Sequence, residues 1–174
     1  MSHRHVNLIS VLDLNLVHTD LTTMFPPPLV EWAVLANLDK QREPEMILLK
    51  GHLYVEMFLK ERFRIQYAYS NKVLDSLSFY RMLTLLESDI GNADLVQMDA
   101  LGLARELNLL RNAVAHEALF DSENAGLHRW ADKALRTLPA TKMQKYTRRT
   151  RLTHAIAALA KVLYASSATG REAK

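Results

Sequence analysis

An arginine, an amide and a histidine occur close together in the chain, at Arg111, Asn112 and His116. A histidine, with an ordinary pKa of about 6.5, can accept or donate a proton near neutral pH, and a guanidinium can bind two oxygens of one phosphate. Cleavage of RNA by its own 2′-hydroxyl needs a base, an acid and a cation that stabilises the charge developing on the phosphate. The three side chains therefore predict metal-free ribonuclease chemistry. His116 would be the acid or base, Arg111 would stabilise the transition state, and Asn112 would orient the histidine or hold a phosphate.

The segment that carries these residues has the pattern of a helix over about residues 98–118. Four apolar residues recur at spacings of four, three and four, which predicts a stripe that faces the core: Leu103, Leu107, Leu110 and Val114. Asn112 and His116 are neighbours on another stripe. Arg111 and His116 are five residues apart, which turns them by about 140° from each other on a straight helix. We therefore expect either a distorted helix or a two-fold partner that completes the site across an interface.

The run from Leu109 to Glu117, together with Lys50 to Glu56 and Asp75 to Phe79, resembles HEPN domains, whose hallmark is an arginine, four to six residues and then a histidine. The resemblance covers roughly residues 45–120, about half of the chain. It implies a helical fold and a metal-independent endoribonuclease, usually a homodimer, in which the arginine and histidine of both protomers meet in one cleft. Carried over to this sequence, Arg111 and His116 are catalytic and Asn112 is the polar residue that often follows the arginine.

The resemblance also implies partners and a biological setting. Enzymes of this type act on RNA, and some are toxins or phage-defence effectors that a cognate antitoxin or another regulatory protein holds in check. Toxins of the family that a nucleotidyltransferase modifies carry a tyrosine two residues after the histidine, where this chain has Ala118. We therefore do not expect that type of regulation. No metal and no cofactor are implied.

A structural role for the same residues is the main alternative. Arg111 would then pair with Glu56 or Glu106, and His116 would cap the last carbonyls of its helix. Glu56 interrupts an apolar run, so we expect it to be partly buried with His52 or Arg111 as its partner. Glu56 and His52 are thus supporting residues of the candidate site. In this alternative the chain is a non-catalytic helical module that binds a protein or a nucleic acid in a regulatory or adaptor role.

A second arginine and histidine of the same spacing, Arg149 and His154, lie in a strongly basic part of the chain. We favour the first pair because Asn112 follows its arginine. The basic residues predict instead a segment that follows a nucleic-acid backbone: Lys142, Lys145, Arg148, Arg149 and Arg151. A solvated helix face and an acidic protein partner are the alternatives.

Composition and helix breakers indicate the elements that must position these residues. The chain has 174 residues, 49 % of them apolar, which fits one domain with a sizeable core. It has no cysteine, which excludes disulfides and thiolate catalysis, and its net charge of +3 predicts no partner by itself. Helix-forming residues dominate and glycine is scarce, which predicts an all-α, single-domain bundle of about five to six helices, HEPN-like in its arrangement. We expect helices near residues 29–40, 45–67, 75–88, 98–118, 125–137 and 142–165.

The ends of the chain are expected to lie outside the bundle. A triple proline at residues 26–28 separates the N-terminal segment from the first helix. The early apolar run contains Asp13 and Asn15 and fits neither a signal peptide nor a membrane-spanning helix, so we expect a soluble, cytoplasmic protein with no membrane partner. Three parts follow: an N-terminal arm over 1–28 that packs on the bundle or a partner, the bundle over 29–165 and a frayed tail over 166–174.

Overall fold

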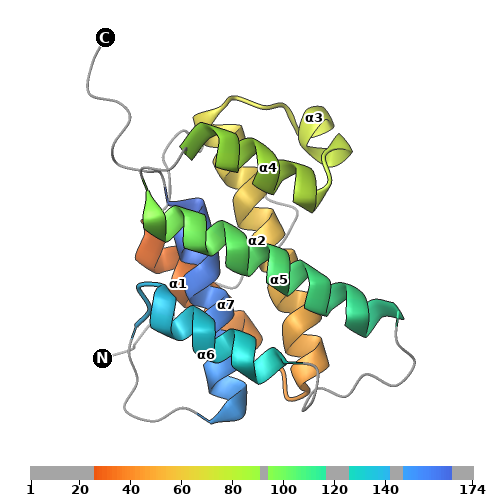
Figure 1. The fold of residues 1–174 in the computed structure, drawn as a ribbon. Coiled ribbons are helices and arrows are strands. Elements are labelled where there is room, and N and C mark those ends of the chain that lie inside the picture. The colour runs from red at the N-terminus through yellow and green to blue at the C-terminus, as the bar shows by residue number, and fades with distance from the viewer. Residues whose placement is uncertain (1–25, 91–93, 117–125, 142–146, 166–174) are drawn as a thin grey trace, which may run out of the picture.

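The computed structural model describes residues 26–90, 94–116, 126–141 and 147–165. All regular structure in these ranges is helical, which confirms the predicted all-α class (Figure 1). The described residues form seven helices: α1 (Pro27–Leu38), α2 (Pro44–Gln66), α3 (Asn71–Ser76), α4 (Phe79–Ile90), α5 (Leu95–His116), α6 (Leu127–Thr137) and α7 (Arg148–Tyr164).

The single helix expected over 75–88 is wrong, because the chain breaks there into α3 and α4. Leu77 has an extended conformation, with φ −88° and ψ 127°. The side chain of Ser78 accepts a hydrogen bond from the backbone N–H of Arg81 (3.2 Å), so this serine caps the start of α4. A serine that bonds to the backbone ahead of it competes with helix continuation, which explains the break.

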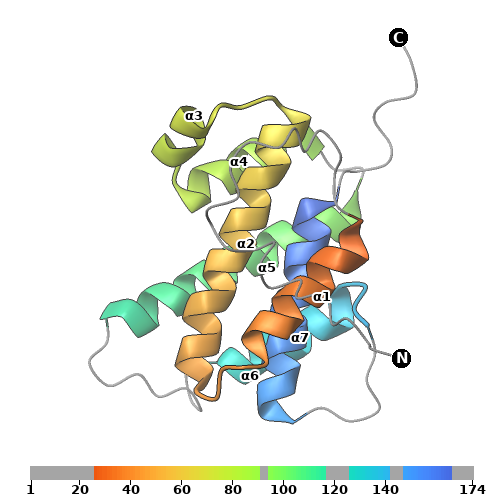
Figure 2. The ribbon, with the colours of Figure 1, turned by 180° about the vertical axis from the view of Figure 1, so that it is seen from behind.

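The helix that carries the candidate site, α5, begins three residues earlier than expected. The carboxylate of Asp94 accepts a hydrogen bond from the backbone N–H of Gln97 (3.0 Å), so Asp94 caps this helix and Asp99 lies in its second turn. The helix then continues without a break to His116, a length of about 33 Å. Its C-terminal end projects beyond the neighbouring helices in both Figure 1 and Figure 2.

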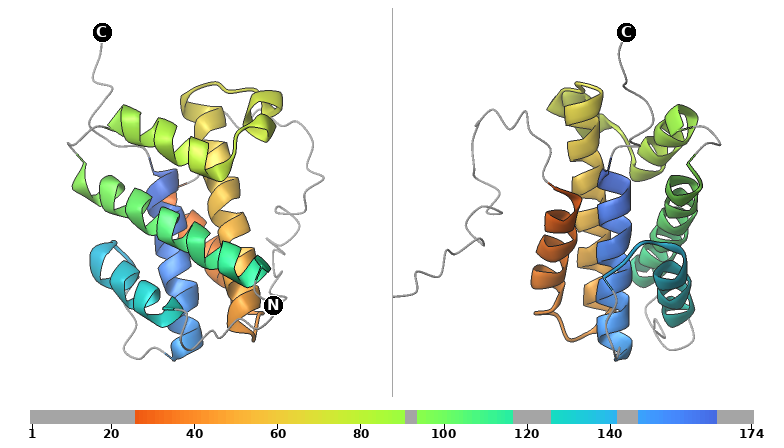
Figure 3. Two further views of the ribbon diagram at one scale, coloured as in Figure 1. Left: turned by 45° about the vertical axis from the view of Figure 1, so that its right-hand side comes forward. Right: turned by 90° about the vertical axis from the view of Figure 1, so that its left-hand side faces the viewer.

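The central element of the bundle is α7, which contacts α1, α2, α5 and α6. In the right-hand view of Figure 3, α1 lies on one side of the pair formed by α2 and α7, and α5 and α6 lie on the other. An apolar stripe on this helix is fully buried: Leu152, Ile156, Leu159 and Leu163. Four alanines extend the buried surface around most of the helix, because a small side chain lets neighbouring helices approach closely: Ala155, Ala157, Ala158 and Ala160.

A buried polar cluster fixes α2 and α5 to the end of α7. Arg62 is 1 % exposed, and its Nη1 donates to Oε1 of Gln97 (3.0 Å) and to the carbonyl of Leu163 (2.9 Å). Nε2 of Gln97 donates to the carbonyls of Val162 (2.8 Å) and Ala165 (3.0 Å). The last carbonyls of a helix lack partners within it, so this cluster satisfies the end of α7 and sets the position of α5.

Part of the expected arm belongs to the bundle. Pro27 and Pro28 form the first turn of α1, where a missing backbone N–H leaves no hydrogen bond unmade. Residues 1–25 and 166–174 lie outside the described residues, so the rest of the arm and the tail stay predictions. In the described part of the chain, no helix combines the length and the apolar character needed to cross a lipid bilayer.

Candidate functional site

The three candidate residues lie on the last two turns of α5. The predicted core stripe is confirmed: Leu103 and Leu107 are buried, and Leu110 and Val114 pack against the core with part of their surface exposed. Arg111 follows Leu107 by one turn, so it leaves the helix on the inner side, where it is half-buried.

The guanidinium of Arg111 has a neutral partner, because its Nη1 donates to Oδ1 of Asn112 (3.1 Å). Neither acid expected to pair with Arg111 does so. Glu56 forms an ion pair with Lys60 (3.1 Å), and Glu106 forms one with a lysine of α6 (2.5 Å). Among the described residues, no carboxylate pairs with Arg111. Within this part of the chain no carboxylate balances the charge of the Arg111 guanidinium, a group that binds anionic oxygens well.

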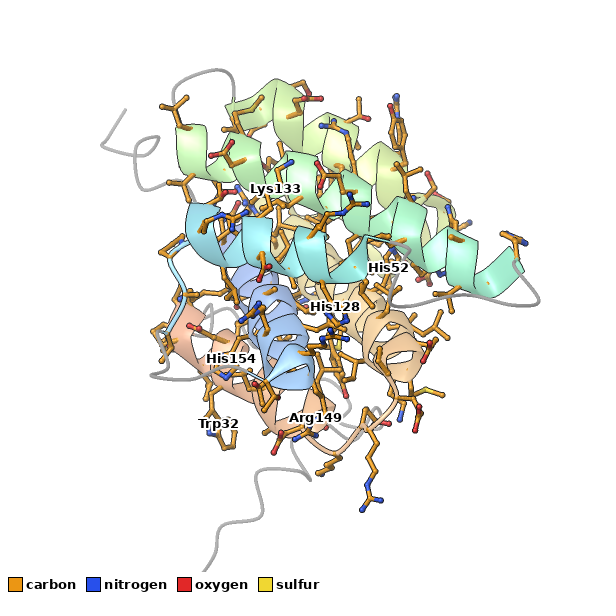
Figure 4. All side chains as sticks on the ribbon, turned by 60° about the horizontal axis from the view of Figure 1, so that its bottom comes forward. Trp32, His52, His128, Lys133, Arg149 and His154 are labelled. Carbon is orange, nitrogen blue, oxygen red and sulfur yellow. The ribbon has the colours of Figure 1, made fainter. Side chains whose placement is uncertain are left out.

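His52 of α2 joins this group through an asparagine. Its Nε2–H donates to Oδ1 of Asn108 (3.0 Å), and its ring lies 4.5 Å from the ring of Phe79, measured between centroids. His52 is 3 % exposed, and its Nδ1 is buried without a hydrogen-bond partner among the described residues. Figure 4 labels His52 next to α5. Sequence reasoning missed Asn108, although its position one turn before Asn112 was an available signal.

Burial favours the neutral form of the His52 ring. Burial lowers the pKa of His52 below its ordinary value of 6.5, the hydrogen bond to Asn108 and the charge of Glu56 oppose this, and the charge of Arg111 lowers it further. The expected pairing of Glu56 with His52 or Arg111 is wrong, because Lys60 lies one turn away on the same helix and binds it instead. His52 therefore holds α2 against α5 beside Arg111.

The structure does not bring Arg111 and His116 together within one chain. The helix between them is continuous, so their directions differ by about 140°. Arg111 faces the bundle, whereas His116 is exposed on the last turn. His116 forms no hydrogen bond or ion pair with the other described residues, so the expected cap of the α5 carbonyls is not seen there. Of the two expected routes to a joint site, the distorted helix is wrong, and a second copy of the chain is left.

The outer face of α5 carries apolar side chains that are mostly exposed. Leu95 is 74 % exposed and Leu109 is 68 % exposed. Between them, a Cβ added to Gly102 would meet no atom within 4 Å, and Arg105 forms an ion pair with an acid of α4 (2.6 Å). Steps of three or four residues connect this stripe to His116. An exposed apolar face of this kind is typical of a protein contact surface.

The second arginine and histidine pair serves the fold. Arg149 donates to the carbonyls of Asp39 (2.8 Å) and Gln41 (3.1 Å) and forms an ion pair with the Asp39 carboxylate (3.1 Å). It thereby satisfies the C-terminal end of α1. Burial lowers the pKa of His154, against the opposing charges of Glu31 and Asp39. Figure 4 shows both residues at the side of the bundle where α1 and α7 meet.

The basic segment is partly neutralised within the chain. Arg151 forms an ion pair with Asp132 (2.9 Å), and Arg149 is held by α1. Arg148 is exposed at the first residue of α7. The two remaining members of the segment lie outside the described residues: Lys142 and Lys145. The described part of this segment is therefore a weaker candidate for phosphate binding than its sequence suggested.

Comparison with known proteins places the chain in no family. No protein-family model, no curated protein and no solved structure matches it. The chemistry of its own side chains is therefore the basis for assigning a function.

Proposed function

We propose that the protein is a metal-independent endoribonuclease of the HEPN type. The observation that carries the proposal is the environment of Arg111, whose guanidinium bonds to the neutral amide of Asn112 while Glu56 and Glu106 are paired elsewhere. A half-buried cation without a carboxylate partner among the described residues favours an anionic ligand. The planar guanidinium matches the oxygens of a phosphate.

Cleavage needs one proton removed and one proton supplied. A histidine takes the proton of the 2′-hydroxyl, the 2′-oxygen attacks the adjacent phosphorus, and the 5′-oxygen leaves as a hydroxyl after receiving a proton from a second acid. In each site His116 of one copy transfers one of these protons beside Arg111 of the other copy, and water transfers the other proton. Arg111 binds the non-bridging oxygens, on which negative charge builds. The products are a 2′,3′-cyclic phosphate and a 5′-hydroxyl.

A second copy supplies what one chain lacks, since Arg111 and His116 of one continuous helix diverge by about 140°. The exposed Leu95 and Leu109 on the outer face of α5 support docking of a second chain along this helix. We infer a homodimer with composite sites. In this proposal the protein acts on RNA in the cytoplasm, as a toxin or a phage-defence effector that an antitoxin restrains.

The test is incubation of the purified protein with labelled RNA in excess EDTA. Arg111→Ala and His116→Ala should each lower the cleavage rate by about 10²-fold or more, since each removes a group that acts in the transition state. Arg81→Ala, which removes an exposed arginine of α4, is the matched control and should cleave like the wild type. Circular dichroism checks that all variants keep the same helicity.

Two results would contradict the proposal. One is cleavage that stops in EDTA, and the other is cleavage that persists in His116→Ala. DNA of the same sequence should not be cut, because it lacks the 2′-hydroxyl.

A further inference from the structure

A groove between α5 and α6 opens beside the candidate site. Its volume is about 330 Å³, and its lining includes the apolar Leu109 and Leu110 and the charged Glu106, Arg129 and Lys133. The wall on the α6 side is held in place by Trp130, which is 4 % exposed and donates from Nε1 to the carbonyl of Leu103 (3.0 Å). The groove therefore has a firm wall, an apolar floor and a cationic rim.

The rim continues as a cationic stripe along α6. Arg129, Lys133 and Arg136 are four and three residues apart, so they lie on one face of the helix, and all three are exposed. Lys133 forms an ion pair with Glu106 (2.5 Å). Arg129 and Arg136 form no hydrogen bond or ion pair with the other described residues, so their two charges are uncompensated there. They are seven residues apart on the helix, which is about 10 Å along its axis.

The groove is close to the residue proposed as acid or base. Leu109, which lines the groove, precedes His116 by seven residues on the same outer stripe of α5, about 10 Å along the axis. A ligand that lies in the groove would thus extend toward the end of α5.

We propose that the groove and the α6 stripe bind the RNA strand next to the scissile phosphate, an inference that rests on the proposed function. Arg129 and Arg136 contact phosphates, and a base lies against the apolar side chain of Leu110, while Leu109 at the edge of the groove contacts the second chain. A stacked strand carries one phosphate per roughly 3.4 Å, so the two arginines span about three nucleotides. The groove combines an apolar floor with a cationic rim. A nucleotide uses both, because its flat base contacts the floor and its phosphate contacts the cations, whereas the carboxylates of an acidic peptide use only the cations.

The test is binding of labelled single-stranded RNA to the full chain, measured by fluorescence anisotropy over a series of salt concentrations. All proteins carry His116→Ala, so that the RNA stays intact. Arg129→Gln with Arg136→Gln should weaken binding about tenfold near 0.1 M salt and lower the slope of log K against log salt by about 1.4. The matched control is Lys72→Gln with Arg81→Gln, which removes the same charge from exposed positions on α3 and α4, at the opposite end of the molecule (Figure 1). The control should bind RNA like the parent protein.

Three results would overturn the proposal: equal weakening in both double variants, absence of RNA binding by the parent, and a loss of affinity for polyglutamate but not for RNA. The last result would identify an acidic protein as the partner.

Failure of the proposed function is a separate outcome. If RNA binding depends on Arg129 and Arg136 but the wild type cuts no RNA, only the proposed nuclease activity is refuted. Cleavage with an unchanged KM in the α6 double variant refutes the RNA-binding groove alone.

Discussion

Replacing Gly51 by alanine tests the packing that holds α2, and with it His52, against α7. A Cβ at Gly51 would lie 2.5 Å from Cδ1 and 3.0 Å from Cγ2 of Ile156, a residue that is 0 % exposed. Overpacking of this kind costs about 1–3 kcal/mol, and alanine regains roughly 0.5–1 kcal/mol in a helix interior. We therefore expect Gly51→Ala to lower the free energy of unfolding by about 1–2 kcal/mol, equivalent to a fall in Tm of about 2–8 °C.

A second substitution separates the contact from other effects of the alanine. Ile156→Val removes Cδ1, the atom nearest to the added Cβ, and by itself costs about 0.5–1.5 kcal/mol. The double variant lacks the closest contact. Its loss of unfolding free energy should therefore be about 1 kcal/mol smaller than the sum of the losses of the two single variants. Urea unfolding of the four proteins, followed by circular dichroism, measures this coupling. Strictly additive losses would refute the reasoning.

Gly102 provides the matched control, because it is also inside a helix but a Cβ there would meet no atom within 4 Å. Gly102→Ala should raise the free energy of unfolding by about 0.5–1 kcal/mol. The comparison needs dilute, monomeric protein, since a second copy docked on α5 would itself contact this residue. A loss of stability in the monomer would contradict the open outer face of α5.

Two further predictions concern buried ionisable groups. Glu31→Gln should lower the free energy of unfolding at pH 7 by about 2–4 kcal/mol, because Lys161 loses its partner at 2.5 Å in a mostly buried site. Chemical denaturation measures this loss, and a loss below about 1 kcal/mol would contradict the prediction. Burial raises the pKa of Glu31, but hydrogen bonds from Lys161 and Thr141 outweigh this and bring the pKa below its ordinary value of 4.5. The stabilisation by the Glu31–Lys161 pair is therefore present above pH 4.5 and is lost as the pH falls through the native pKa. The stability curves of the wild type and Glu31→Gln should therefore converge in acid. For His52, burial lowers the native pKa below 6.5, so the unfolded chain takes up this proton first and stability declines as the pH falls below that value. An NMR titration of the His52 ring should have its midpoint below pH 6.5, and a midpoint above that value would show that the ring is not desolvated.

Much of the fold could be predicted because the helices are long and their boundaries are marked by proline, glycine and polar residues. The break at Leu77 and Ser78 was missed, since the apolar pattern continues across it and only the serine cap interrupts the helix. The central position of α7 in the bundle was not predicted. Alanine favours a helix at exposed and buried positions alike, so the alanines of this helix were only a weak signal of burial.

The candidate site was predictable in its residue types and helix positions but not in its contacts. His52 and Arg111 were the expected partners of Glu56, and Lys60, which lies one turn after Glu56 on the same helix, was not considered. The bond from His52 to Asn108 joins residues 56 positions apart and depends on how α2 crosses α5. Such a contact follows from the packing of the whole bundle rather than from a local pattern.

Mixing two inactive variants tests the composite site most directly. Arg111→Ala and His116→Ala are unfolded together, refolded and assayed on RNA in EDTA. If each site takes its arginine from one copy and its histidine from the other, half of the dimers are mixed and each mixed dimer has one intact site. The mixture should then recover about a quarter of the wild-type activity. A mixture no more active than the separate variants would contradict a site shared between two chains.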